Sequence, residues 1–217
     1  DTMRVISISD PLNPTQIGKC YLNVDQLMDI YGIDTLVYVA CRGTGFKIIN
    51  VASPSAPVEI GSFDTQGQTY DVLVVDTIAY VADGTKGIRV INVADPTSPV
   101  EIGFYDTNGI SQGLAIDGNK LYVAEGGSGI KVFDVSDPTN PQQLGVYDTP
   151  GTAKKVLIYD SLFVADGSGG VRIIDVANPT TPVEVGYMGC FGTATNLVHI
   201  GKMLYLADGA DGMYLLH

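Results

Sequence analysis

Short apolar segments alternate with turn residues along the whole chain. In one representative stretch, residues 113–117, 120–125, 129–135 and 142–147 are rich in Val, Ile, Leu and Tyr, and Gly, Asp, Ser and Pro separate them. Apolar runs of this length, bounded by turn residues, predict β-strands. Because no long window has a helical period with capping residues, the pattern indicates an all-β fold without parallel βαβ units.

The apolar pattern repeats with a period of about 42 residues. An alanine ends one apolar segment in each repeat, at spacings of 42, 42, 41 and 42: Ala40, Ala82, Ala124, Ala165 and Ala207. A pair of prolines recurs in step and is followed by a Gly, with the first proline of each pair at Pro11, Pro54, Pro96, Pro138 and Pro179. A fixed period of this length predicts structural repeats that pack side by side.

Each repeat is predicted to contain four antiparallel strands, called first to fourth in chain order. The turn between the second and third strands contains Gly in every copy, and the third-to-fourth link contains the two prolines. This arrangement is typical of a β-propeller blade. We predict a single propeller domain over residues 1–217 with five four-stranded blades, in repeats of approximately 21–63, 64–105, 106–147, 148–187 and 188–217.

The third strand occurs six times, once more than the other strands. The surplus copy is N-terminal and contains Met3, Val5, Ile6 and Ile8, whereas the fifth repeat lacks a fourth strand. We expect residues 3–20 to form the third-to-fourth strand part of the closing blade, with Thr15 to Cys20 as its outer strand, because closure removes free strand edges. Three alternatives stay open for the surplus strand. It is an extra edge strand of that blade or swaps there with Met213 to Leu216, it is an arbitrary end of a six- or seven-bladed or longer array, or it inserts into a neighbouring copy.

Three segments carry a resemblance to a known family: YVADGTKGIRVINVADPTSPVEIGFYDT, LYVAEGGSGIKVFDVSDPTNPQQLGVYDT and LFVADGSGGVRIIDVANPTTPVEVG. They resemble LVIVD repeats, and the resemblance covers almost the whole chain. It implies a β-propeller from a bacterium or archaeon, in an extracellular or cell-surface location, and it brings no catalytic motif. The first and last copies depart most from the pattern, at Cys41-Arg42 and at Met188-Gly189-Cys190.

The chain is acidic. It contains 12 Lys and Arg against 24 Asp and Glu, for a formal charge of −12, which repels phosphate backbones and excludes nucleic acid as a partner. No apolar stretch approaches the roughly 20 residues that span a bilayer, so we expect no transmembrane segment. The three cysteines, Cys20, Cys41 and Cys190, cannot all pair within one chain, and a Cys20–Cys190 disulfide is one open alternative.

Seven acidic residues are the candidate binding residues. Four end second strands and three end fourth strands, and propeller geometry would gather them on one face: Asp83, Glu125, Asp166 and Asp208, with Asp64, Asp106 and Asp148. Ca²⁺ prefers several oxygen ligands close together, so carboxylate rings are one route to a metal site. We favour the other interpretation, in which Asp before Gly starts a tight turn and bonds its own backbone. The sequence therefore predicts no cofactor, with Ca²⁺ as the alternative.

Aromatic and basic residues at repeat positions have two interpretations each. Tyr38, Tyr80, Tyr122 and Tyr205, with Phe163 in the fourth copy, fit the core between blades better than a carbohydrate platform. Lys154-Lys155 begins a first strand near the mouth of the predicted channel. This pair is either an anion site or a solvated charge, and the second interpretation is favoured.

The leading functional hypothesis is a non-catalytic, exported or cell-surface binding or assembly module. Its partner is a protein, a surface polymer or a second copy of itself, bound in the last case through the N-terminal strand. One alternative is an enzyme at the channel mouth with Lys155 or His199 as acid and base. Another is a metal-supported, lectin-like module on the acidic face. Near-identical repeats without a nucleophile motif argue against the enzyme.

Overall fold

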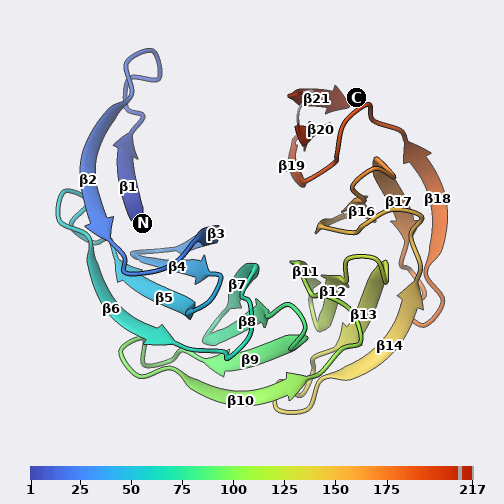
Figure 1. The fold of residues 1–217 in the computed structure, drawn as a ribbon, viewed down its shortest axis with the longest axis horizontal. Helices are drawn as coiled ribbons and strands as arrows, with labels where there is room; N and C mark the ends of the chain where they lie inside the picture. Colours follow the sequence, from blue (N-terminus) through green and yellow to red (C-terminus); the bar gives the residue numbers. More distant parts are fainter. Residues whose placement is uncertain (210–211, 217) are drawn as a thin grey trace.

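The computed structural model describes residues 1–209 and 212–216. The elements assigned there are β-strands, arranged in six antiparallel sheets that follow one another along the chain in an arc (Figure 1). No helix within these ranges is long and apolar enough to cross a membrane. The predicted all-β fold with repeated four-stranded sheets is therefore confirmed.

Four sheets are complete and two are partial. The complete sheets are β3 (Leu27–Ile33), β4 (Leu36–Cys41), β5 (Gly45–Asn50) and β6 (Val58–Phe63); β7 (Asp71–Val75), β8 (Ile78–Ala82), β9 (Ile88–Asn92) and β10 (Val100–Tyr105); β11 (Gly113–Asp117), β12 (Lys120–Ala124), β13 (Ile130–Asp134) and β14 (Gln142–Tyr147); β15 (Lys155–Tyr159), β16 (Ser161–Ala165), β17 (Val171–Asp175) and β18 (Val183–Met188). The partial sheets are β1 (Thr2–Ser7) with β2 (Thr15–Tyr21), and β19 (Asn196–Ile200) with β20 (Met203–Ala207) and β21 (Met213–Leu216).

Every complete sheet has its first strand on the concave side of the arc and its fourth strand on the rim (Figure 1). Neighbouring sheets pack face to face through apolar side chains, of which Phe46, Ile91 and Phe133 have no exposed surface. Tyr38 and Tyr80 belong to these cores, as the sequence predicted. Burial between repeats explains why each repeat keeps the same apolar positions, since no sheet can cover its own faces.

The Gly that follows each proline pair has a packing role. A Cβ atom on Gly61 would lie 2.0 Å from the carbonyl oxygen of Pro96, and one on Gly103 would lie 2.4 Å from that of Pro138. The fourth strand of one sheet therefore touches the proline link of the next sheet through backbone alone. Only glycine allows this approach, which connects two landmarks of the repeat that lie more than thirty residues apart.

The N-terminal segment differs from the predicted closure. Residues 3–20 form a third-to-fourth strand hairpin as expected, but β2 pairs with β1 and does not complete the sheet of β19, β20 and β21. The hairpin packs on the first complete sheet, where Met3, Cys20 and Leu22 are buried with Val39. The connection from β2 to β3 is short, so the hairpin can reach the sheet of β3 to β6. The sheet of β19 to β21 lies across the opening of the arc (Figure 1).

Candidate functional site

A cavity of about 670 Å³ lies between the first strands of the arc. Its wall is mainly apolar and includes Ile30, Leu73, Ala115, Leu157 and Val198, one residue from each of the five first strands. Alternate residues of a strand point to one face, so five parallel copies of the same strand line one channel. A concave, largely apolar cavity with a few polar groups is the usual form of a small-molecule site.

One repeat position at the mouth of the channel differs in almost every copy. Repeats one to five have there Asp29, Asp71, Gly113, Lys155 and Asn196, at spacings of 42, 42, 42 and 41. Each of these residues begins or nearly begins a first strand. Several other repeat positions also differ between copies, but this one places charged side chains of three copies together at the mouth of the channel.

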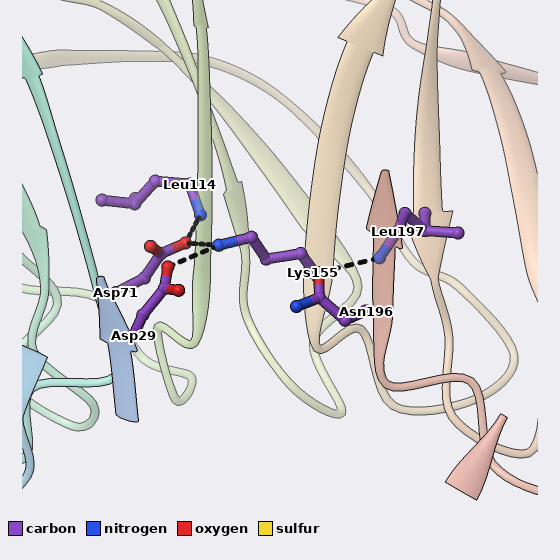
Figure 2. A network of polar contacts seen from close by, with 6 residues as sticks. All are labelled: Asp29, Asp71, Leu114, Lys155, Asn196 and Leu197. Atoms are coloured by element: carbon purple, nitrogen blue, oxygen red, sulfur yellow. Dashed lines mark hydrogen bonds and ion pairs between the residues drawn. The ribbon is translucent and has the colours of Figure 1, made fainter. Parts of the chain in front are cut away.

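Three of these side chains form one ionic cluster, which we call the mouth triad. The Lys155 ammonium donates to Oδ2 of Asp29 at 2.8 Å and to Oδ2 of Asp71 at 2.7 Å (Figure 2). The backbone N–H of Leu114 donates to the same Asp71 oxygen at 2.8 Å. The triad thereby joins the first, second and fourth complete sheets through a lysine 126 residues away from Asp29.

Gly113 makes room for the triad. A Cβ atom there would lie 2.6 Å from the Lys154 carbonyl oxygen and 2.7 Å from Cα of Lys155. The close approach of β15 to β11 therefore requires glycine at this point. It brings Lys155 near enough to reach past the third repeat to Asp71 (Figure 2).

Burial and mutual charge set the protonation of the triad. Burial, together with the adjacent Asp29 carboxyl, raises the pKa of Asp71 to about 7 against the opposing charge of Lys155. Burial also disfavours ionised Asp29, but its hydrogen bond with Asp71 and the Lys155 charge lower its pKa overall. Burial disfavours the charged form of Lys155, but the two carboxylates more than offset this effect and raise the pKa of Lys155 overall. The lysine is therefore protonated near neutral pH, when the carboxyl pair still holds part of one proton.

The four acidic residues that follow second strands are structural. Asp83, Glu125, Asp166 and Asp208 have no exposed surface. Asp83 accepts hydrogen bonds from the hydroxyls of Thr65 and Thr69, and Asp166 accepts from Thr149 and from the N–H of Gly151. The carboxylates thus bind the loop that enters the first strand of their own sheet, rather than only their own turn. Burial raises the pKa of Asp83 to about 6 despite these hydrogen bonds.

The other three acidic candidates lie on the rim. Asp64, Asp106 and Asp148 are exposed, and Asp106 forms an ion pair of 2.7 Å with Arg89. Within residues 1–209 and 212–216, no three His, Cys, Asp or Glu side chains are grouped to hold a metal ion. The seven predicted binding residues therefore have two different environments, four of them buried and three exposed. The sequence interpretation missed Asp29, Asp71 and Asn196, which alignment of the repeats at Lys155 would have revealed.

The other residues singled out in the sequence lie away from the mouth triad. His199 stacks on Tyr159 with ring centroids 3.8 Å apart, about 10 Å along the strand direction from the position of Lys155. Cys20 and Cys41 are buried free thiols of one apolar cluster, and Cys190 is a free thiol near the other end of the arc. The open alternative of a Cys20–Cys190 disulfide is therefore not found.

The buried acids lead to a prediction about metal ions. We expect neither Ca²⁺ nor EDTA to shift the melting temperature, because Asp83 and its three counterparts are buried and each carboxylate already accepts at least one hydrogen bond within the fold. Differential scanning fluorimetry with and without each reagent measures this. A rise with Ca²⁺ that EDTA reverses would contradict the structural role and favour the metal-supported alternative.

Comparison with solved structures shows the same fold at low sequence identity. The computationally designed Ika8 protein matches with a TM-score of 0.72 and 11% identity, over 92% of this chain and 61% of Ika8. A functionally unknown protein from Desulfotomaculum acetoxidans DSM 771 matches with a TM-score of 0.74 and 15% identity, over 88% of this chain and 65% of that protein. The designed Ika4 protein matches with a TM-score of 0.59 and 11% identity, over 70% of this chain and 92% of Ika4. The chain thus spans less than two thirds of Ika8 and of the D. acetoxidans protein.

Sequence comparison gives the family. None of the curated proteins compared with the chain matches it. The model of the LVIVD repeat matches four consecutive segments, residues 34–65, 66–107, 108–149 and 150–188, which together cover well over half of the chain. With the repeated four-stranded sheets, these matches show that the chain belongs to the LVIVD-repeat family.

Proposed function

We propose that the protein is a non-catalytic binding module whose ligand site is the channel between the first strands. The observation that carries this proposal is the divergent repeat position, which places Asp29, Asp71, Lys155 and Asn196 at the mouth of an apolar cavity. A repeat protein gains specificity where its copies differ, because identical copies present the same chemistry.

The shape and polarity of the channel favour a small amphipathic ligand. Apolar strand residues form the wall, and the mouth triad offers both a cation and carboxylates to a polar head group. The side chains of Lys155 and Asp29 are 22% and 28% exposed, so a ligand head group has access to them. Burial of the apolar part supplies affinity, and the polar groups orient the ligand.

Binding is favoured over catalysis by the state of the basic residues. A protonated Lys155 held by two carboxylates is neither a nucleophile nor a general base near neutral pH. His199, the other candidate, belongs to a different part of the first strands. We further propose an exported or cell-surface location, with a protein or surface polymer as the larger partner, as the family resemblance implies.

The architecture supports a related proposal about the closed form. Strands run in order from the concave side to the rim in each complete sheet, as blades do in a β-propeller. We propose that the arc closes into such a ring when its two ends are joined, with a number of blades that depends on what joins them.

A probe titration tests the channel. We expect 1-anilinonaphthalene-8-sulfonate to bind saturably, with decanoate and decylammonium as competitors that distinguish an anionic from a cationic head group. Val198→Glu should lower the affinity at least tenfold, because it puts a charge in the apolar wall. Val146→Glu on the rim is the matched control, since both valines are 52% exposed. Equal binding by the two variants, or no saturable binding by the unmodified protein, would exclude the channel as the site.

A further inference from the structure

Two polar cavities lie side by side next to the mouth of the channel. Their volumes are about 230 and 380 Å³, and Tyr70 lines both. The first cavity lies against the mouth triad, because Asp29 and Lys155 also line it. The second is lined by the β6–β7 loop and the β8–β9 turn, with Gln68 and Lys86 in its wall. We call the two cavities together the polar groove.

Three cations at the polar groove form no ion pair within the described residues: Arg42, Lys86 and Lys154. Lys86 and Lys154 line the groove, and the Arg42 guanidinium lies 5.9 Å from the centroid of the Tyr70 ring. Arg42 donates hydrogen bonds to the neutral side chains of Gln26 and Gln68, which leave its charge uncompensated. The chain has a formal charge of −12, so these cations form a local positive region on an acidic protein.

The acidic side chains near the polar groove are either already bound or outside it. Asp29 is the one acidic residue among the described residues that line the groove, and it accepts a hydrogen bond from Lys155. Beyond Lys86, a third cavity has exposed acidic residues of the rim in its wall: Asp64, Glu101 and Asp106. An anionic ligand is therefore attracted between Lys86 and Lys154 and repelled at the rim.

None of the three cations belongs to the repeat pattern. The position of Arg42 is glycine in the other copies: Gly84, Gly126, Gly167 and Gly209. The position of Lys154 is uncharged in the other copies: Met28, Tyr70, Gln112 and Thr195. The position of Lys86 is uncharged in the three other copies that the structure describes there: Thr44, Ser128 and Gly169. A side chain required for packing between repeats recurs in each copy, whereas one that contacts a ligand is needed only where the ligand lies.

Backbone hydrogen bonds between neighbouring sheets hold the polar groove in shape. The N–H of Thr69 donates to the Arg42 carbonyl oxygen at 2.9 Å. Gly84 and Ser111 exchange two such bonds, at 3.1 and 3.0 Å. Each bond joins a turn of one sheet to the loop that enters the next sheet. A groove that is formed before the ligand arrives loses little conformational entropy on binding, which favours affinity.

We infer that the polar groove binds an anionic polysaccharide, whose carboxylates pair with Lys86 and Lys154. The amide side chains of Gln68 and Gln112 also line the groove, and amides suit sugar hydroxyls because both groups donate and accept hydrogen bonds. An acidic peptide would also meet the cations, but the aliphatic side chains in the wall are only those of Met28 and Ile110 among the described residues. The inference rests on the surface-polymer part of the proposed function and does not depend on the channel ligand.

A galacturonate hexasaccharide is the probe that tests this inference. We expect isothermal titration calorimetry on residues 1–217 to show saturable binding that weakens as the ionic strength rises. The fully methyl-esterified hexasaccharide has the same sugars without charge, and it should bind roughly tenfold more weakly because the cations have no partner. Hexaglutamate has the charges without the hydroxyls, and it should also bind roughly tenfold more weakly.

Single substitutions locate the binding site. Lys86→Gln and Lys154→Gln each remove one cation, and each should lower the affinity for the hexasaccharide roughly fivefold. Lys154→Arg keeps the charge and should bind like the unmodified protein. The matched control is Lys202→Gln, since Lys202 is exposed and forms no ion pair in the described chain. Lys202 follows the first strand β19, whereas Lys154 precedes the first strand β15, so the two lysines lie at opposite ends of equivalent strands.

Two cross-tests separate this inference from the channel proposal. Lys86 does not line the channel, so Lys86→Gln should bind 1-anilinonaphthalene-8-sulfonate like the unmodified protein. Val198 does not line the polar groove, so Val198→Glu should bind the hexasaccharide like the unmodified protein. Loss of one ligand with retention of the other therefore identifies which proposal fails.

Four results would overturn the inference. One is the absence of saturable hexasaccharide binding. Another is an equal loss of affinity in Lys86→Gln, Lys154→Gln and Lys202→Gln, which would show unspecific attraction to surface lysines. The third is equal binding of the methyl-esterified hexasaccharide, which would remove the role of the cations. The last is hexaglutamate binding as tight as that of the hexasaccharide, which would make an acidic peptide the partner.

Discussion

Replacing Lys155 by Met should lower the free energy of unfolding by about 3 kcal/mol at neutral pH, because it leaves two adjacent carboxyl groups without their shared cation. Asp71 is only 2% exposed, so water replaces little of the lost interaction. Urea denaturation of the variant and the unmodified protein measures the difference. This loss of stability should exceed the loss from breaking any other ion pair in the described chain, because the mouth triad bridges sheets that are not neighbours.

The pH dependence of this loss identifies its cause. The pKa of Asp71 is raised to about 7, so the folded state holds its proton more tightly than the unfolded state, and stability from this group falls as pH rises from about 4 to 7. Without the Lys155 charge that pKa is higher still, and the fall continues above pH 7. The difference between variant and unmodified protein should therefore grow between pH 6 and 8, by at most about 1.4 kcal/mol per pH unit.

The control for this substitution is Lys202→Met. Lys202 is exposed and forms no ion pair in the described chain. Its replacement should change stability by less than about 0.5 kcal/mol at any of these pH values. A pH-independent loss in Lys155→Met would mean that packing of the aliphatic side chain, and not the charge, supports the mouth triad.

Replacing Gly61 by Ala should destabilise the fold by about 3 kcal/mol, because the new methyl group would lie 2.0 Å from the Pro96 carbonyl oxygen. The neighbouring atoms are backbone, so they cannot rotate away. The two sheets would have to separate, and the apolar cluster between them would open. Urea denaturation measures this loss as a shift of the midpoint.

Gly186→Ala is the matched control for Gly61→Ala. The two glycines have the same repeat position, but a Cβ atom on Gly186 would be at ordinary contact distance, 3.5 Å, from Ile173. We expect a change below about 0.5 kcal/mol in the isolated chain. Equal losses in the two variants would show that strand propensity, and not the contact between sheets, explains the recurring glycine.

The interpretation of the acidic residues shows where repeat analysis fails. Asp83 and Asp64 both recur beside strand ends, so the sequence treated them as members of one surface set. In the structure Asp83 is buried under the loop that enters the first strand of its own sheet, while Asp64 is exposed on the rim. Burial of a strand end depends on the loop that covers it, and Thr65 and Thr69 would have marked that loop.

The sequence by itself determined the local structure of each repeat. Alternating apolar residues, the Gly turns and the paired prolines act over a few residues, so strand order and the hairpin of residues 3–20 were predictable. The recurrence of the glycines was also visible in the sequence repeat, although the contact that explains it is made with the next sheet.

Only the tertiary structure decided the curvature of the arc and what that curvature brings together. Lys155 meets Asp29 across 126 residues, and the hairpin of β1 and β2 stays apart from β19 and β20. Both outcomes depend on small rotations that add up over successive contacts between sheets. A local pattern sets each contact but does not reveal their sum, so the mouth triad became visible only in the folded chain.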